Sequence, residues 1–135
     1  MGMKFYLTWQ LIDKAQVLMG LKRYKEAQEA NKEGLQIALT INRKEYIFQG
    51  RLVDARLALA SGDLKAGRAQ LQALLTDAHK EEERAMVHYR LGQIPEQAAL
   101  AHKQTALKVY RELFKRTPKA EYRRRIHELE TSLGS

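Results

Sequence analysis

The sequence contains no cysteine and only two prolines among its 135 residues. Without cysteine the chain can form no disulfide framework and no thiolate metal site, and it has no cysteine nucleophile. A chain without disulfides suits a reducing compartment, so we expect a cytoplasmic location. Because proline breaks helices in their interior, its scarcity leaves room for long helical segments.

Long apolar runs are also missing. No segment approaches the ~18 apolar residues that a membrane span requires. The run from Phe5 to Ile12 is interrupted by Thr8 and Gln10, and Asp13 follows it directly. It lacks the small-residue cleavage pattern of a signal peptide. We therefore expect neither a membrane span nor a signal peptide.

The residue patterns of catalytic and ligand-binding sites are absent from the sequence as well. The glycines are dispersed, so there is no glycine-rich phosphate loop, and there is no Gly-x-Ser-x-Gly elbow. The histidines, His79, His88, His102 and His127, include no pair at the i, i+4 spacing that places two imidazoles on one helical face. The sequence thus predicts a non-enzymatic protein with no catalytic residue, metal or cofactor.

Helix-forming residues in an amphipathic pattern fill most of the chain. Apolar residues make up 44% of it and charged residues 30%, which is the profile of a soluble helical protein. The apolar residues recur at three- and four-residue spacing, and alternation with a period of two never lasts. This pattern predicts an all-α protein without strands. The predicted helices, about seven, cover approximately residues 4–20, 24–41, 44–60, 64–78, 81–92, 95–116 and 119–133.

Several residues mark where these helices should begin, end or weaken. Asn42 can end the second helix in a left-handed conformation, and Asp63 is a good N-cap for the fourth. Pro95 fits the first turn of the longest helix, because its missing N–H would have no partner there. Asn31 and Gly34 interrupt the apolar stripe of the second helix and are its weak points.

An internal repeat organises the helices into antiparallel hairpins. A shift of 40 residues, followed by one of 30, aligns similar residues, namely Ala15 with Ala55 and Ala85, Tyr24 with Leu64 and Ile94, and Ala27 with Gly67. The small residues let two helix backbones approach, and the bulky residue fills the remaining space. We predict hairpins at about residues 4–41, 44–79 and 81–116 and a capping helix at about 118–133, in a single domain over residues 1–135.

The repeated positions resemble the tetratricopeptide repeat (TPR), over about residues 5–117. The matching positions are Ala15, Lys22, Tyr24 and Ala27, then Ala55, Gly62, Leu64 and Gly67, then Ala85, Gly92, Ile94 and, poorly, Gln97. The resemblance implies a short right-handed solenoid that acts as a protein–protein interaction or scaffold module. The 40-residue spacing exceeds the usual ~34 and is similar to divergent repeats in large bacterial signalling proteins, which implies a sensor or docking region.

In TPR proteins a concave groove formed by the first helix of each hairpin holds a peptide. By the resemblance, the groove positions in this chain are Trp9, Gln16, Gln49, Arg56, His79 and Met86. The partner would be another protein, a peptide or another domain of a longer parent chain. Self-association is also open, because the end of a helical array exposes an apolar face.

Positive charge collects near the C-terminus, where residues 101–135 carry nine basic and four acidic side chains. The predicted basic patch consists of Lys108, Arg111, Lys115, Arg116, Lys119, Arg123, Arg124 and Arg125. One interpretation is an ordinary solvated face on the last helices, and another is a surface for an acidic partner. The alternative function is a basic helical module that binds nucleic acid. The acidic trio Glu81–Glu83 is interpreted as favourable charge in the first turn of a helix.

Overall fold

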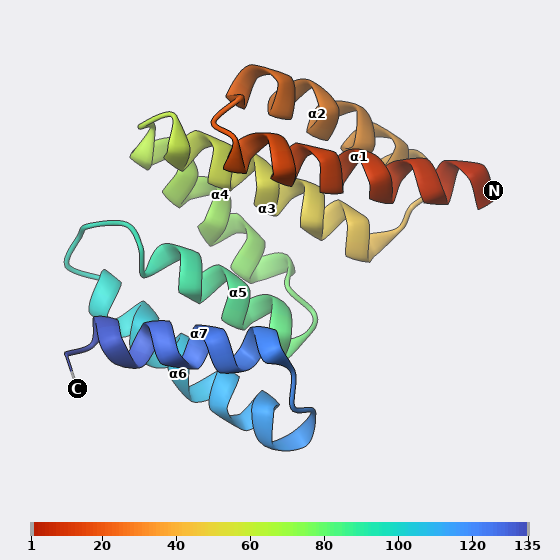
Figure 1. Cartoon of the computed structure of the whole chain (residues 1–135). Coiled ribbons are helices and arrows are strands. Elements are labelled where there is room, and N and C mark those ends of the chain that lie inside the picture. The colour runs from red at the N-terminus through yellow and green to blue at the C-terminus, as the bar shows by residue number, and fades with distance from the viewer. Residues whose placement is uncertain (1, 135) are drawn as a thin grey trace. The chain divides into compact units, whose positions relative to one another are not determined.

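The structure is a computed structural model that describes the backbone of residues 2–134 and the side chains from Tyr6 to Gly134. These residues form seven α-helices and no strand (Figure 1), which confirms the predicted all-α class. The helices are α1 (Gly2–Gly20), α2 (Tyr24–Thr40), α3 (Lys44–Ala60), α4 (Leu64–Asp77), α5 (Glu81–Leu91), α6 (Ala99–Arg116) and α7 (Ala120–Ser132). None of these helices combines the length and the apolar character that crossing a membrane requires.

Three links of identical length connect the first four helices. Each contains one residue with positive φ, namely Lys22 at 63°, Asn42 at 54° and Gly62 at 91°. The residue after it donates its N–H to a carbonyl five positions earlier, at 2.9–3.1 Å. This 6→1 bond is the mark of a Schellman motif, which satisfies carbonyls at the end of a helix. The prediction for Asn42 is confirmed by its left-handed conformation just after α2. The prediction for Asp63 is confirmed because its Oδ1 accepts the N–H of Ala66 at 3.1 Å.

Replacing Lys22 with glycine is expected to stabilise the protein. A left-handed conformation places the Cβ of an L-residue too close to the following carbonyl, at a cost of ~1–2 kcal/mol, whereas glycine adopts it freely. Glycine loses more backbone entropy on folding than lysine, which offsets part of this gain. We therefore expect Lys22→Gly to raise the free energy of unfolding by ~0.5–1 kcal/mol, measured by urea denaturation. Asn42→Gly is the control, with a smaller gain, since asparagine tolerates this conformation. A destabilised Lys22→Gly variant would contradict the assigned turn.

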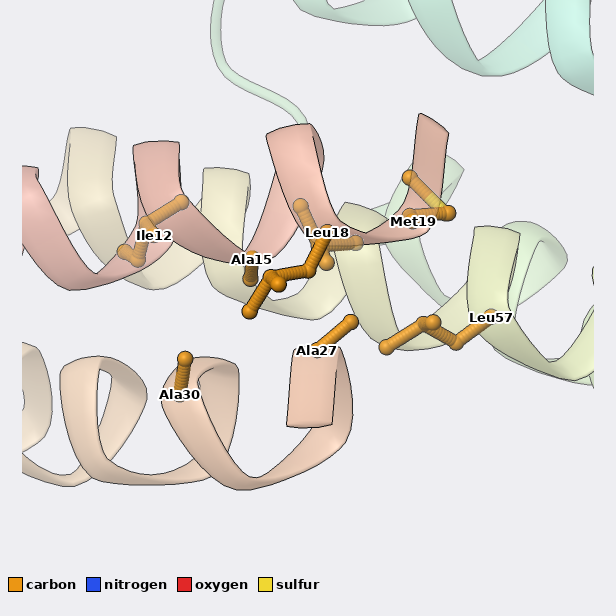
Figure 2. Packing of buried hydrophobic residues seen from close by; sticks show 8 residues of the cluster. Ile12, Ala15, Leu18, Met19, Ala27, Ala30 and Leu57 are labelled. Carbon is orange, nitrogen blue, oxygen red and sulfur yellow. The ribbon is translucent and has the colours of Figure 1, made fainter. Parts of the chain in front are cut away.

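The contacts of the chain divide it into two compact units, residues 1–70 and 71–135. In the first unit α1 packs on α2, and α3 packs on both. Figure 2 shows how Ala15 of α1 lies opposite Ala27 and Ala30 of α2, with Leu18 and Leu57 filling the adjacent space. Small side chains at this contact allow the two helix backbones to come close, as the repeat predicted.

The second unit has a separate core made by α5, α6 and α7. α6 packs on both neighbours, and the core holds Ala85, Tyr89, Ala106, Leu107, Tyr110, Tyr122 and Leu129. The Tyr110 and Tyr122 rings lie 5.8 Å apart between centroids at a tilt of 45°. Tyr110 and Tyr122 lie among basic residues in the sequence, but both side chains are buried in the core and offer no exposed stacking surface.

Two details of the predicted helices are wrong. The helix predicted to start at Pro95 begins at Ala99, because residues 92–98 form a turn that buries Ile94 to 2% exposure. Burial of this side chain outweighs the preference of proline for a first helical turn. Leu64, predicted to face inwards, is 38% exposed. It is the first residue of α4, and Leu71 and Leu74 further along the helix are the buried positions.

Candidate functional site

The structure brings together two of the predicted groove residues in the first unit. Gln16 of α1 and Arg56 of α3 are half-buried, and Arg56 Nη1 donates a hydrogen bond to Gln16 Oε1 at 3.3 Å. Trp9 and Gln49 each precede these residues by seven positions, which is close to two helical turns, so each lies on the same side of its helix. The 40-residue repeat thus relates positions that are spatial neighbours.

Trp9 is half exposed and belongs to an apolar stripe on the outer side of α1. Tyr6, Trp9, Val17 and Leu21 are 50–62% exposed. Tyr6, Trp9 and Val17 lie within one side of the helix, and Leu21 follows its last residue, Gly20; we call the four residues the α1 stripe. The Tyr6 and Trp9 rings lie edge to face, 6.3 Å apart at an angle of 71°. Exposed aromatic and aliphatic side chains that gather in this way are typical of interaction surfaces.

The last two predicted groove residues, His79 and Met86, belong to the second unit. Met86 lies on α5 and is half-buried. His79 was predicted to lie on the first helix of its hairpin, but it is an exposed residue of the link before α5. α5 begins at Glu81, and the Glu83 carboxylate accepts the N–H groups of His79 and Lys80 just before it, at 3.1 and 3.3 Å. This interaction caps α5 and holds His79 outside it.

Half of the predicted basic patch is paired with acidic side chains. The pairs, with N–O distances, are Arg111–Glu130 at 2.6 Å, Arg116–Glu81 at 2.8 Å, Lys119–Glu82 at 3.9 Å and Arg125–Glu128 at 3.5 Å. The first three pairs join exposed side chains and contribute ~0–1 kcal/mol each. Arg123 lies 5.6 Å from the Phe114 ring centroid. Lys108, Lys115 and Arg124 are exposed and have no ion-pair partner among the residues that the structure describes.

The acidic trio supplies three different contacts. Glu83 caps α5, which confirms its interpretation as a residue of the first helical turn. Glu81 pairs with Arg116, and Glu82 accepts a hydrogen bond from the Tyr122 hydroxyl at 2.7 Å. Burial, followed by this bond to Glu82, raises the pKa of Tyr122 well above its ordinary value. The trio therefore ties the start of α5 to the segment around α7.

A cleft of 460 Å³ lies in the second unit between the turn after α5 and the helices α6 and α7. Its lining includes Tyr89, Ile94, Lys103, Glu128 and Ser132. The Tyr89 hydroxyl donates to Glu128, and Lys103 Nζ donates to Ser132 Oγ at 2.6 Å. These two hydrogen bonds join α7 to α5 and to α6 across the cleft.

Sequence reasoning missed a pair of histidines. His88 of α5 and His102 of α6 are half-buried, with their Nδ1 atoms 2.9 Å apart. Their ring centroids are 5.1 Å apart and the rings are tilted by 33°. Burial, and secondly the His102 imidazole, lowers the pKa of His88. A spacing rule for one helix could not find this pair, because its members come from two packed helices.

We also looked for larger groups of metal-binding side chains and for similar proteins. Within the described part of the chain, no group of three or more His, Cys, Asp or Glu side chains could hold a metal ion. Comparisons with protein-family models, curated proteins and solved structures find no match for this chain.

Proposed function

We propose that this chain is a non-enzymatic TPR-like module, stacked as a short solenoid, that binds a protein or peptide partner. The observation that carries the proposal is the face formed by α1 and α3, where Trp9 is exposed and Arg56 contacts Gln16. Helical hairpins of this kind provide a broad, rigid surface, and its side chains determine which partner is bound. The partner is a separate protein or another domain of a longer parent chain.

The chemistry of this face supports a peptide ligand. Trp9 offers a large apolar surface with an indole N–H, and tryptophan and arginine are enriched among the residues that dominate binding energy. Gln16 and Gln49 provide amide groups that can bond to a peptide backbone. We further propose a docking role within a bacterial signalling protein, because the 40-residue spacing resembles that of divergent repeats in such proteins.

The experiment is a selection of displayed random peptides on the immobilised chain, followed by affinity measurement for the enriched peptides. We expect Trp9→Ala to weaken their binding by tenfold or more, since truncation of a central tryptophan typically costs ~2 kcal/mol or more. Leu100→Ala is the matched control, because Leu100 is 57% exposed on α6 and should leave affinity unchanged. Both variants should melt within a few degrees of the parent protein, as exposed positions do.

The nucleic-acid alternative is separated by titrating duplex DNA and single-stranded RNA at 50 and 200 mM salt. Binding that falls steeply with salt and is unaffected by Trp9→Ala would assign the function to the basic patch. Peptides that bind the Trp9→Ala variant as tightly as the parent chain would contradict the proposed face. Self-association through the α1 stripe would appear as a dimer in light scattering that Trp9→Ala dissociates.

A further inference from the structure

We propose that His88 and His102 form a binding site for a divalent late transition-metal ion, Cu²⁺ above all, that links α5 to α6. The two side chains come from neighbouring helices, and their Nδ1 atoms are 2.9 Å apart. Neutral imidazole nitrogen is a preferred ligand of copper, nickel and zinc. This site lies in the second unit and is independent of the proposed peptide-binding face.

With the rings turned about their Nδ1 atoms and the nitrogens kept at this separation, the separation indicates which metal fits. An ion at ~2.0–2.1 Å from each nitrogen, as is usual for imidazole ligands, would form an N–metal–N angle of about 90° across this gap. Tetrahedral zinc would need the nitrogens further apart, at about 3.3 Å. Two cis ligands at a right angle belong to square-planar or tetragonal sites, which Cu²⁺ and Ni²⁺ prefer. Cu²⁺ also heads the general affinity order for such ligands.

The rings reach this arrangement by a local movement. Their centroids are 5.1 Å apart, so the imidazoles now meet end to end, and the Nδ1–H of one ring donates a hydrogen bond to the Nδ1 of the other. Metal binding requires each neutral ring to carry its proton on Nε2 and to turn until both Nδ1 lone pairs point at the ion. Both residues are half-buried, so one side of the pair is open to solvent. Water would occupy the remaining coordination positions.

The surroundings of the pair favour a fixed site. A Cβ added to Gly92 would lie 2.7 Å from Lys103 Cγ and 3.3 Å from the His88 carbonyl oxygen, so α5 and α6 approach closely beside the pair. The neighbouring cations are directed elsewhere. Arg84 Nη1 donates to the Ala78 carbonyl at 3.1 Å, and Lys103 Nζ donates to Ser132 Oγ. These bonds direct both charges away from the incoming ion.

The test is titration of the full, tag-free chain with CuCl₂ at pH 7 in a non-coordinating buffer. We expect a saturable 1:1 complex whose electron paramagnetic resonance spectrum shows two nitrogen ligands. At ten times the dissociation constant, Cu²⁺ should raise the melting temperature by about 4 °C. Ni²⁺ should bind more weakly than Cu²⁺, and Mg²⁺, which prefers oxygen ligands, should have no effect.

Single substitutions identify the ligands. His88→Gln or His102→Gln should lower the affinity for Cu²⁺ by tenfold or more, whereas His79→Gln and His127→Gln should leave it unchanged, as both of these side chains are exposed. Circular dichroism without metal checks that each variant is folded, and paramagnetic broadening of amide signals in the parent chain locates the ion without any substitution. The absence of saturable binding, broadening centred away from α5 and α6, or equal affinity in the double variant His88→Gln/His102→Gln would overturn the proposal.

Discussion

Asn31→Asp is expected to destabilise the protein by ~3–5 kcal/mol at pH 7, because it places an unpaired charge in the core. Asn31 is fully buried on α2. Its Nδ2 donates to the Gly50 carbonyl at 2.8 Å and to Asp54 Oδ1 at 2.7 Å, both on α3. An aspartate at position 31 has no N–H to donate and would face two oxygen acceptors. The substitution changes few atoms, so the loss reports the charge rather than the shape.

The destabilisation caused by Asn31→Asp should depend on pH with a defined sign. Burial raises the pKa of Asp54 in the folded parent chain, and the hydrogen bond from Asn31 opposes this shift. In the variant that bond is lost and a second carboxylate lies beside the first, which raises the pKa of the pair in the folded state. The folded pair therefore keeps a proton that the two carboxyl groups of the unfolded chain release above pH ~4. Stability of the variant should therefore fall as the pH rises from about 4. Urea denaturation of both proteins at pH 4.5 and pH 8 measures the difference.

The double variant Asn31→Asp/Asp54→Asn provides the control. It exchanges donor and acceptor, so the amide at position 54 can donate to the carboxylate at position 31. We expect recovery of part of the lost stability, because one negative charge is removed while the Gly50 carbonyl still lacks its donor. An equal loss at both pH values, or a double variant that is as unstable as the sum of the two single ones, would contradict the buried polar contact.

Local features of the fold were predictable from the sequence. The turn at Asn42 that follows α2 and the N-cap at Asp63 both depend on conformational preferences and hydrogen bonds within a few residues. The repeat register is less local, and it aligns Gln16 with Arg56, whose side chains are in contact. Amphipathic spacing and self-comparison are sufficient for such features, because each is encoded in one segment or in its copy.

Features that depend on packing between distant residues were not predictable. Asn31 looked like a weak point of an apolar stripe, but it connects α2 to α3 through donors and acceptors that its own helix does not reveal. The preference of Pro95 for a first helical turn predicted a helix start that the structure does not have, because Ile94 is buried in a turn there. Likewise, the histidine pair depends on how α5 packs on α6. Spacing along the chain contains no information about these contacts.

Gly67→Leu is expected to destabilise the protein by ~1–3 kcal/mol through overpacking. A Cβ at this position of α4 would lie 2.4 Å from Leu59 Cδ2 and 2.6 Å from Leu59 Cγ. The Leu59 side chain can rotate to relieve these contacts, but the Ala55 carbonyl oxygen, 3.3 Å from the added Cβ, belongs to the backbone of α3. An alanine adds only this Cβ and requires mainly a change at Leu59, whereas the further carbons of a leucine leave no room beside the α3 backbone and require the two helices to separate. Gly67→Ala should cost less than Gly67→Leu.

Gly20→Ala separates this packing effect from the intrinsic effect of replacing a helical glycine. Gly20 is the last residue of α1, and an added Cβ would meet nothing within 4 Å, so this variant should be neutral or gain up to ~1 kcal/mol. Thermal and urea denaturation of the three variants give the order Gly20→Ala, Gly67→Ala, Gly67→Leu from most to least stable. Because Gly67 occupies the repeat position of Ala27, which is fully buried, that order would show that the small residue is required by helix contact. An unchanged melting temperature for Gly67→Leu would mean that α3 and α4 do not pack in this register.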